Sequence, residues 1–332
     1  MKAKCVLIVT LCILFSSIAP PIGLSASAEK YPQRPIEVIV TFPPGGPNDI
    51  GTRAINEKLS QKLGVPVLVI NKPGAGGVLG SSTVARARKD GYTLLSTSTP
   101  SMISMPVIEP KNVDYDPRRD FEPLGRYGYL IAVILVRNDS PFRSFEDLSE
   151  FTKKNPGKLS CGIVQGVGLV PHLVSETLRS SGLKIEVITA KGVPQNTSFL
   201  LGGHVDLTID SLAATAGFLL DGKLRALAVV LEKRLPDFPD IPTLAEKGYP
   251  QATFVFWAGY FAPAGIPQKV KNTLVPALKQ AMMDPEVVEK LKKLQFLPEY
   301  GAPELLRKEI VEQQRTIRDA ATRIGIIQGA QK

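Results

Sequence analysis

Residues 42–53 read FPPGGPNDIGTR and follow the apolar run IEVIV, which predicts a buried strand over 36–40. The prolines, among them Pro44, stiffen the exit from that strand. Gly45 and Gly46 can adopt positive φ, which would bring their N–H groups close to a ligand. Asn48 or Asp49 is predicted to cap the next helix. Because a helix N-terminus carries partial positive charge, this loop favours a carboxylate or a phosphate, although a plain turn is the alternative.

Two more glycine-containing loops follow predicted strands. The segment NKPGAGG at 71–77 follows a strand over 65–70, and GIVQGVGLVPH at 162–172 begins in a strand over 159–163. Neither is a dinucleotide fingerprint, because Leu79 and Pro171 stand where the third glycine would be. Tight helix packing is the alternative for the first loop. In the second, Gly166 and Gly168 are predicted to present amides from a second domain.

Signatures of catalysis are sparse. The chain has two histidines, which argues against a histidine-based triad or a multi-histidine metal site, and we expect no metal and no cofactor. Neither G-x-S-x-G nor H-E-x-x-H occurs. Asp49 and Asp210 lie near strand ends and are the candidates for a general base; Asp210 could equally bind a ligand or cap a helix. Side chains interpreted as packing are Cys161, His172 and Trp257.

The N-terminus has the pattern of a secretory signal peptide. Lys2 and Lys4 precede an apolar stretch over 5–18, and Ala26-Ser27-Ala28 supplies small residues for cleavage before Glu29. A membrane anchor is the alternative. We therefore expect an exported, periplasmic chain whose remaining cysteine, Cys161, forms no internal disulfide. The formal net charge of +9 is spread along the chain, so no basic patch predicts nucleic-acid binding.

Strands and helices alternate along most of the chain, which predicts an α/β fold. Two such units predict two domains, each a mainly parallel sheet flanked by helices, with a ligand cleft where the carboxyl ends of the strands meet. Further predicted strands are 92–96, 130–136, 185–189, 206–209 and 226–230. Predicted helices are 50–63, 81–87, 144–154, 171–181, 197–201, 268–283, 285–294 and 303–324.

The mature chain resembles the tripartite tricarboxylate transporter receptors, the Bug family of extracytoplasmic solute-binding proteins. The segments that carry the resemblance are YPQRPIEVIVTFPPGGPNDIGTR, VINKPGAGGVLGSSTVARARKDGYTLL, GKLRALAVVLEKRLPDFPDIPTLAEKGYP and FWAGYFAPAGIP. The resemblance implies a type II-like Venus flytrap of two domains, 29–130 plus 256–332 and 131–255, hinged near 129–131 and 254–257. We expect a protein without enzymatic activity, and no feature of the sequence indicates more than a monomer.

Carried over to this chain, the resemblance implies that a small organic acid is bound by these residues: Pro44, Gly45, Gly46, Asp49, Ser98, Thr99, Ser101, Gly166, Val167, Gly168 and Asp210. The implied partner is a two-component membrane permease of the same transporter type. A sensory co-receptor that presents the ligand to a membrane kinase is the alternative output, and a secreted enzyme using Asp49 or Asp210 as base is a third. Leu169 and Val170 replace hydroxyl residues of relatives, which favours a monocarboxylate with an apolar tail.

Overall fold

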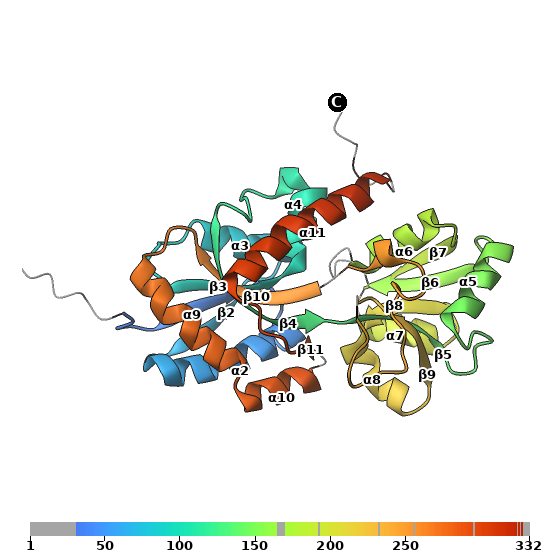
Figure 1. The fold of residues 1–332 in the computed structure, drawn as a ribbon, viewed down its shortest axis with the longest axis horizontal. Coiled ribbons are helices and arrows are strands. Elements are labelled where there is room, and N and C mark those ends of the chain that lie inside the picture. The colour runs from blue at the N-terminus through green and yellow to red at the C-terminus, as the bar shows by residue number, and fades with distance from the viewer. Residues whose placement is uncertain are drawn as a thin grey trace, which may run out of the picture. The chain divides into compact units, whose positions relative to one another are not determined.

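The computed structural model contains two β-sheets, each flanked by helices (Figure 1). It describes residues 31–164, 170–191, 193–231, 233–254, 256–294, 296–323, 325 and 327. The predicted signal peptide and the predicted site residues Gly166, Val167 and Gly168 lie outside the described residues. No helix in the described part of the chain is long and apolar enough to cross a membrane.

The first sheet has six strands and mixes parallel with antiparallel pairs. Its strands are β1 (Ile36–Val40), β2 (Val67–Asn71), β3 (Thr93–Ser98), β4 (Phe121–Leu130), β10 (Phe256–Pro263) and β11 (Phe296–Leu297), in the order β11-β4-β10-β3-β1-β2. Strand β1 pairs in parallel with β2 and β3. Strand β10 pairs antiparallel with β3 and β4, and β11 pairs antiparallel with β4. The parallel strands therefore gather at one side of this sheet.

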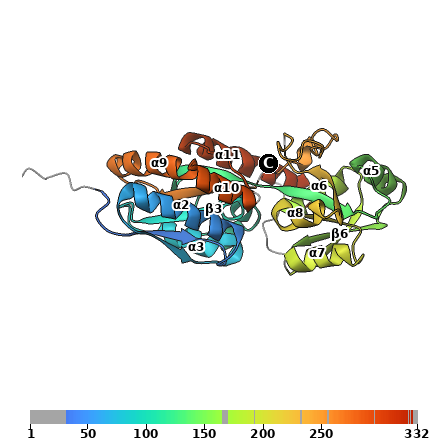
Figure 2. The same cartoon turned by 90° about the horizontal axis from the view of Figure 1, so that it is seen from below.

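Helices cover both faces of the six-stranded sheet (Figures 1 and 2). On one face, α2 (Pro47–Leu63) packs with α9 (Gln268–Met282) and α10 (Pro285–Lys293). The other face carries η1 (Ala75–Gly77), α3 (Val78–Ala85), η2 (Pro100–Ser104), α4 (Met105–Ile108), η3 (Pro110–Asn112) and α11 (Pro303–Arg323). The alternation of side chains along the strands sends buried residues to both layers.

The second sheet has five strands in the order β7-β6-β8-β5-β9. Strand β6 pairs in parallel with β7 and β8, whereas β5 pairs antiparallel with β8 and β9. The strands are β5 (Ala132–Arg137), β6 (Leu159–Val164), β7 (Ile185–Ala190), β8 (Leu207–Ser211) and β9 (Leu224–Val229). The carboxyl ends of β6, β7 and β8 consequently lie at the same edge.

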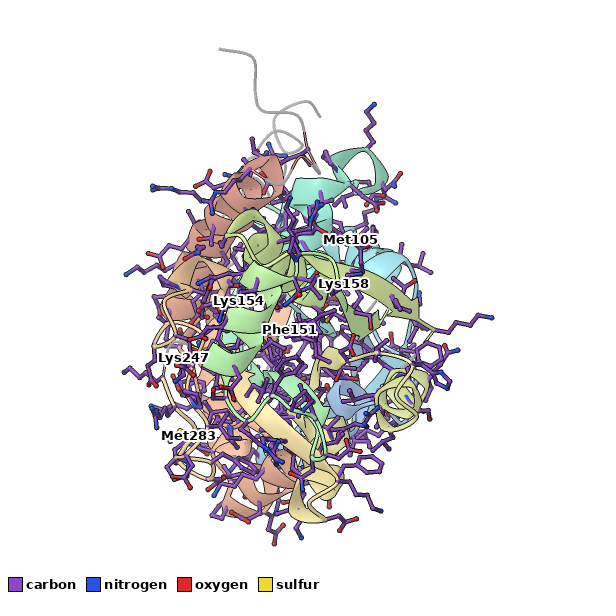
Figure 3. All side chains as sticks on the ribbon, turned by 90° about the vertical axis from the view of Figure 1, so that its right-hand side faces the viewer. Met105, Phe151, Lys154, Lys158, Lys247 and Met283 are labelled. Atoms are coloured by element: carbon purple, nitrogen blue, oxygen red, sulfur yellow. The ribbon has the colours of Figure 1, made fainter. Side chains whose placement is uncertain are left out.

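Two helices pack on each face of the five-stranded sheet. Helices α5 (Phe145–Lys154) and α6 (Val170–Ser180) share a core cluster with Cys161, Ile163 and Ile209. Helices α7 (Val193–Leu201) and α8 (Leu212–Leu220) cover Val133 and Leu135 on the opposite face. On the surface shown in Figure 3, Lys247 donates to Glu146 of α5 over 2.6 Å. A short η4 (Pro250–Ala252) precedes β10.

The predicted α/β class is confirmed, with helix bounds within a few residues of those expected. Ser144 caps α5 in a capping box with Asp147, as its sequence pattern indicates. The expectation of mainly parallel sheets was wrong, because antiparallel strands β4, β10 and β5 lie inside the sheets. The chain passes from the first sheet to the second at Ile131, between β4 and β5. The domain bounds and the hinge stay predictions.

A buried arginine joins strand β4 to the C-terminal part of the chain. Arg126 is fully buried and forms ion pairs with Glu299, at 2.9 Å, and with Glu309 of α11. Its guanidinium also lies over the ring of Tyr129, 4.0 Å from the centroid. The backbone of Arg126 exchanges two hydrogen bonds with Gly301. Burial raises the pKa of the Glu309 carboxyl even beside this cation.

We expect Arg126→Met to lower the free energy of unfolding by about 3–5 kcal/mol, because it leaves the largely buried Glu309 carboxylate without its cation. Arg307→Met is the matched control. Arg307 also extends from α11 to form an ion pair, with Glu122 at 2.9 Å, but its side chain is half exposed. Its loss should cost less than about 1 kcal/mol. Guanidinium unfolding of the two variants gives the comparison, and equal losses would contradict the assigned role of Arg126.

Candidate functional site

The parallel strands of the first sheet end beside one another, and each is followed by one of the segments singled out in the sequence. Strand β1 leads into the loop 41–46 and α2, β2 into η1 and α3, and β3 into η2. Strand β1 lies between the other two. Polar side chains join these ends: Thr41 bonds Thr97 over 2.8 Å, and Thr52 of α2 bonds Ser96 over 2.7 Å. The loops are therefore parts of one polar edge.

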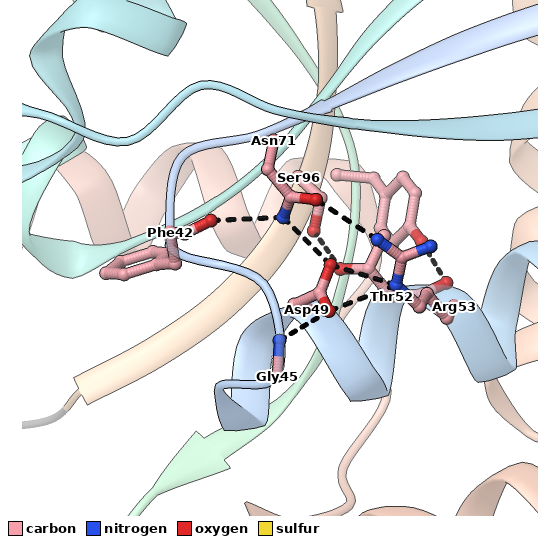
Figure 4. Close-up of polar contacts among 8 residues, drawn as sticks. Phe42, Gly45, Asp49, Thr52, Arg53, Asn71 and Ser96 are labelled. Atoms are coloured by element: carbon pink, nitrogen blue, oxygen red, sulfur yellow. Dashed lines mark hydrogen bonds and ion pairs between the residues drawn. The ribbon is translucent and has the colours of Figure 1, made fainter.

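Asp49 holds the loop between β1 and α2 in shape (Figure 4). Its carboxylate is buried in the first turn of α2 and accepts the backbone N–H of Gly45 at 2.9 Å. It also accepts hydrogen bonds from Arg53 at 3.0 Å and from Nδ2 of Asn71 at 2.8 Å. Asn71 in turn donates to the carbonyl of Phe42. One side chain thus ties the loop, the helix and the end of β2 together.

This network keeps the Asp49 carboxyl ionised. Burial by itself raises the pKa of Asp49, but hydrogen bonds from Arg53, Asn71 and the Gly45 N–H outweigh burial and hold that pKa below its ordinary value. A carboxylate already occupied by three donors is a poor proton acceptor. Asp49 is therefore suited to positioning the loop, and the geometry argues against the general-base alternative at this residue.

The start of α2 differs from the prediction in its cap. Gly46 is the N-cap, and Pro47 follows it at the first helical position. Neither Asn48 nor Asp49 caps the helix, and no side chain in the described part of the chain bonds its end. Asn48 instead accepts a hydrogen bond from Tyr127. The first-turn N–H groups consequently have no side-chain acceptor, which suits an anion brought from outside.

The two glycines of the loop have different conformations. Gly45 has a φ of 80°, and this left-handed backbone turns its N–H toward Asp49. Gly46 has a φ of −77°, so it does not use the positive φ that glycine permits. A Cβ at Gly46 would meet only the carbonyl oxygen of Pro43, at 3.5 Å. Pro44 and Gly45 are exposed, and Gly46 is partly exposed.

The NKPGAGG loop supports packing more than ligand contact. A Cβ at Gly77 would come within 3.1 Å of both Thr41 and Ser101, and one at Gly80 within 2.9 Å of the Lys72 carbonyl oxygen. Gly74, Gly76 and Gly77 all have positive φ. The loop brings α3 close to the ends of β1 and β3, as the packing interpretation predicted. Asn71, the first residue of this segment, acts on the loop after β1 through its hydrogen bond to Asp49, a role that the sequence did not predict.

Ser98, Thr99 and Ser101 are buried around the start of a π-helical turn, η2. Ser101 shares a 2.6 Å hydrogen bond with Thr97, and Thr99 accepts the backbone N–H of Trp257 at 2.9 Å. The Ser98 hydroxyl has no hydrogen-bond partner among the described residues. It is the member of this trio whose hydrogen-bonding capacity is left for a ligand or a water.

The far side of the same turn is held by two side chains. Tyr115 donates to the carbonyl of Ser101 at 2.7 Å, and Gln314 of α11 donates to that of Met102 at 3.0 Å. The neighbouring Gln313 accepts the indole N–H of Trp257 at 3.1 Å. Trp257 is fully buried, in agreement with its prediction as a packing residue.

In the second sheet, Asp210 lies near the carboxyl end of β8 and is buried. Its Oδ1 accepts the N–H of Ser211 at 2.7 Å, and its Oδ2 accepts Nδ2 of Asn196, from α7, at 3.0 Å. Asn196 also lies against Gly162 of β6, where a Cβ would come within 2.3 Å of its Oδ1. Helix α8 begins after Ser211 without a side-chain cap, so the capping role considered for Asp210 was wrong.

Burial dominates the titration of Asp210. Removal from water raises its pKa from 3.8 to about 6, against the opposing hydrogen bonds from Asn196 and Ser211. The thiol of Cys161 is buried as well, and its pKa is raised to about 12, which agrees with an inert core cysteine. The side chain of His172 lies outside what the structure describes. Asp49 and Asp210 therefore have opposite electrostatic surroundings.

Hydrogen-bond donors, rather than a reactive constellation, characterise these strand ends. The donors of the first sheet are the uncapped start of α2 and the Ser98 hydroxyl. Among the described residues, no group of three or more histidine, cysteine, aspartate or glutamate side chains is placed to hold a metal ion. Neither Asp49 nor Asp210 is hydrogen-bonded to a hydroxyl or a thiol of the described residues. The geometry suits a ligand-binding protein of α/β fold.

Comparison with known proteins gives the same class. Residues 52–326 match the family described as "Tripartite tricarboxylate transporter family receptor". The chain is 38% identical to the UPF0065 protein of the tcbD-tcbE intergenic region of Pseudomonas sp. strain P51, covering 84% of this chain and 82% of the other. It is 32% identical to BugT of Bordetella pertussis, covering 91% of each chain.

Solved structures are similar over nearly their whole length. A periplasmic transporter protein is 37% identical with a TM-score of 0.76, covering 90% of this chain and 99% of the other. An R. palustris protein solved with adipate is 27% identical (TM-score 0.76, 89% and 99% covered). MatC of Rhodopseudomonas palustris, solved with malate, is 28% identical (TM-score 0.72, 87% and 99% covered).

The protein is thus a solute-binding receptor and not an enzyme. It belongs to the tripartite tricarboxylate transporter receptor family, whose members include Bug proteins and are periplasmic. This confirms the resemblance that the sequence motifs carried. The individual ligand contacts predicted for this chain stay predictions.

We expect Asp49→Asn to lower the free energy of unfolding by about 1–3 kcal/mol, because an amide replaces the carboxylate that accepts from Gly45, Arg53 and Asn71. The pKa of Asp49 is lowered, so its contribution is fully present above its ordinary value near pH 3.8 and is lost at lower pH. Hydrogen exchange at the Gly45 amide should also become faster. Glu57→Gln, exposed on the same helix, is the control and should change neither property.

Asp210→Asn should change the pH dependence of stability in the opposite sense. Because the pKa of Asp210 is raised to about 6, its contribution is complete below the unfolded value and is lost as the pH rises through 6. Raising the pH from 5.0 to 7.5 should therefore shift the stability difference in favour of Asp210→Asn by about 1–2 kcal/mol. Unfolding at both pH values measures this. A pH-independent difference would show that Asp210 is ionised at pH 5.0.

Proposed function

We propose that this chain captures a small carboxylate-bearing solute in the periplasm and delivers it to a two-component membrane permease driven by an ion gradient. The cleft would lie between the strand ends of the two sheets, one in each domain. A signal peptide over residues 1–28, cleaved before Glu29, would export the chain, which would act as a monomer. Closure of the domains over the ligand would present the closed form to the permease.

The observation that carries this proposal is the uncapped start of α2. Its first-turn N–H groups lack a side-chain acceptor in the described part of the chain, while the preceding loop is locked by Asp49. A preorganised set of backbone donors at a helix N-terminus is suited to a carboxylate. The buried Ser98 hydroxyl, without a partner among the described residues, would add a donor from the neighbouring strand. Thr99 and Ser101 would hold the backbone next to Ser98 in place through their hydrogen bonds to Trp257 and Thr97.

Two structural relatives help to set the ligand class. One was solved with adipate and one with malate, which are both dicarboxylates. The replacement of hydroxyl residues by Leu169 and Val170 favours a monocarboxylate with an apolar tail on the second domain, where Gly166, Val167 and Gly168 would supply amides. A ligand panel must therefore include adipate, malate and citrate together with aliphatic and aromatic monoacids.

Gly46→Val tests the site without disturbing the fold. The φ of −77° and ψ of 164° at Gly46 suit a β-branched residue, and the nearest atom to a new Cβ is 3.5 Å away. Its side chain would stand at the mouth of the helix N-terminus. We expect unchanged stability without ligand and at least a tenfold weaker binding of the acid that stabilises the wild-type protein.

The measurement is a thermal-shift screen of protein that has been unfolded and refolded to remove carried ligand. An acid at one hundred times its dissociation constant should stabilise the wild-type chain by about 2.7 kcal/mol. Gly64→Val at the end of the same helix is unsuitable as a control, since its φ of 70° would be strained. Glu57→Gln serves instead. If no acid stabilises the wild-type protein, or if Gly46→Val binds normally, the proposed site is wrong.

A further inference from the structure

The buried group around Asp210 contains one hydrogen-bond acceptor that has no donor among the described residues. Both carboxylate oxygens, the Gly162 carbonyl and the Asn196 Oδ1 are acceptors, and Nδ2 of Asn196 serves Asp210 and Gly162 together, at 3.0 and 3.3 Å. Asn196 is fully buried, and its Oδ1 has no hydrogen-bond partner among the described residues. A buried acceptor without a donor is costly, so this group can accept one more hydrogen bond.

No cation among the described residues compensates for a charge on Asp210. Helices α7 (VPQNTSFLL) and α8 (LAATAGFLL), which cover its face of the sheet, contain no charged residue. Strand β6 contributes the Cys161 thiol from the opposite face. On the remaining elements, Arg137, at the far end of β5, pairs with Asp139, and Glu176 of α6 pairs with Arg179. Arg225 of β9 donates to Asn138 and to the carbonyl of Phe142, and Glu186 of β7 is exposed. Lys191, before α7, is exposed, and His172 is the titratable residue near the start of α6.

We propose that the receptor binds its acid together with one proton, which lies between a ligand carboxylate and the carboxyl group of Asp210. This inference rests on the proposed function. Two carboxylates at one buried site cannot both stay ionised without a cation, so the approach of the ligand would favour uptake of a proton from water. The protonated carboxyl group would then donate a hydrogen bond to the ligand anion. Burial already raises the pKa of Asp210 from 3.8 to about 6 without ligand, which favours the gain of a proton.

The two buried aspartates would therefore act differently on the same ligand. Asp49 is ionised, and its oxygens accept hydrogen bonds from Gly45, Arg53 and Asn71. It would therefore position the first loop without contacting the ligand. Asp210 would meet the ligand as a neutral acid. The dissociation constant of a ligand that already carries its proton, or of a neutral amide of the same shape, would not depend on pH in this way.

The test is isothermal titration calorimetry with whichever of adipate, malate or benzoate gives the largest thermal shift. Titrations at pH 7.5 in buffers of low and high ionisation enthalpy give the number of protons taken up. We expect close to one proton for the wild-type protein and none for Asp210→Asn. The dissociation constant of the wild-type protein should rise about tenfold between pH 7.0 and 8.0, whereas that of Asp210→Asn should be constant.

Two further variants identify the group that gains the proton. Asp206→Asn, immediately before β8, removes a carboxylate whose acceptors serve Ser160, and should leave proton uptake unchanged. His172→Asn should also leave it unchanged. Binding without proton uptake by the wild-type protein, or uptake that persists in Asp210→Asn or disappears in His172→Asn, would overturn the inference alone. If none of the acids binds at any pH, the proposed function fails and this inference fails with it.

Discussion

The burial of one guanidinium constrains much of the first sheet and its helices. Arg126 has no exposed surface, and its charge is compensated by Glu299 and by Glu309 of α11. A buried charge requires its partners to stay in place, so α11 is fixed against β4. The next two turns of α11 place Gln313 against Trp257 and Gln314 against Met102. The π-helical turn that contains Ser101 and follows Ser98 of β3 is thus held by α11, which the ion pair with Arg126 positions.

The two buried aspartates at the strand ends, Asp49 and Asp210, also differ in whether a cation compensates for their charge. Asp49 has a cation and two neutral donors, which make ionisation favourable in spite of burial. Asp210 has two neutral donors and no cation, so burial is the larger effect. The neighbours differ, since Arg53 lies beside Asp49 and no cation among the described residues lies beside Asp210. A receptor built in this way can hold one anionic group internally and still accept another from solution.

The sequence predicts the elements with a strong hydrophobic pattern and misses those that depend on distant partners. The apolar run 36–40 and the helix signals around Ser144 needed only local reasoning. Strand β4, FEPLGRYGYL, contains two glycines, a proline and Arg126, so it lacks an apolar alternation, and it becomes a strand by pairing with β10. The roles of Asn71 and Asn196 were missed for the same reason, because their aspartate partners lie 22 and 14 residues away.

The loop within residues 42–53 also shows why the role of Asp49 was not predicted from the sequence. An aspartate beside two glycines at a helix start suggested a cap or a base, but the left-handed conformation of Gly45 curls the loop back over the first turn. The Asp49 carboxylate then accepts the N–H of Gly45 in the loop, and the start of α2 is left without a side-chain cap. A general base would need a free acceptor and a raised pKa, and Asp49 has neither. Its carboxylate instead holds the loop beside the uncapped start of α2, where the proposed anion would meet backbone amides.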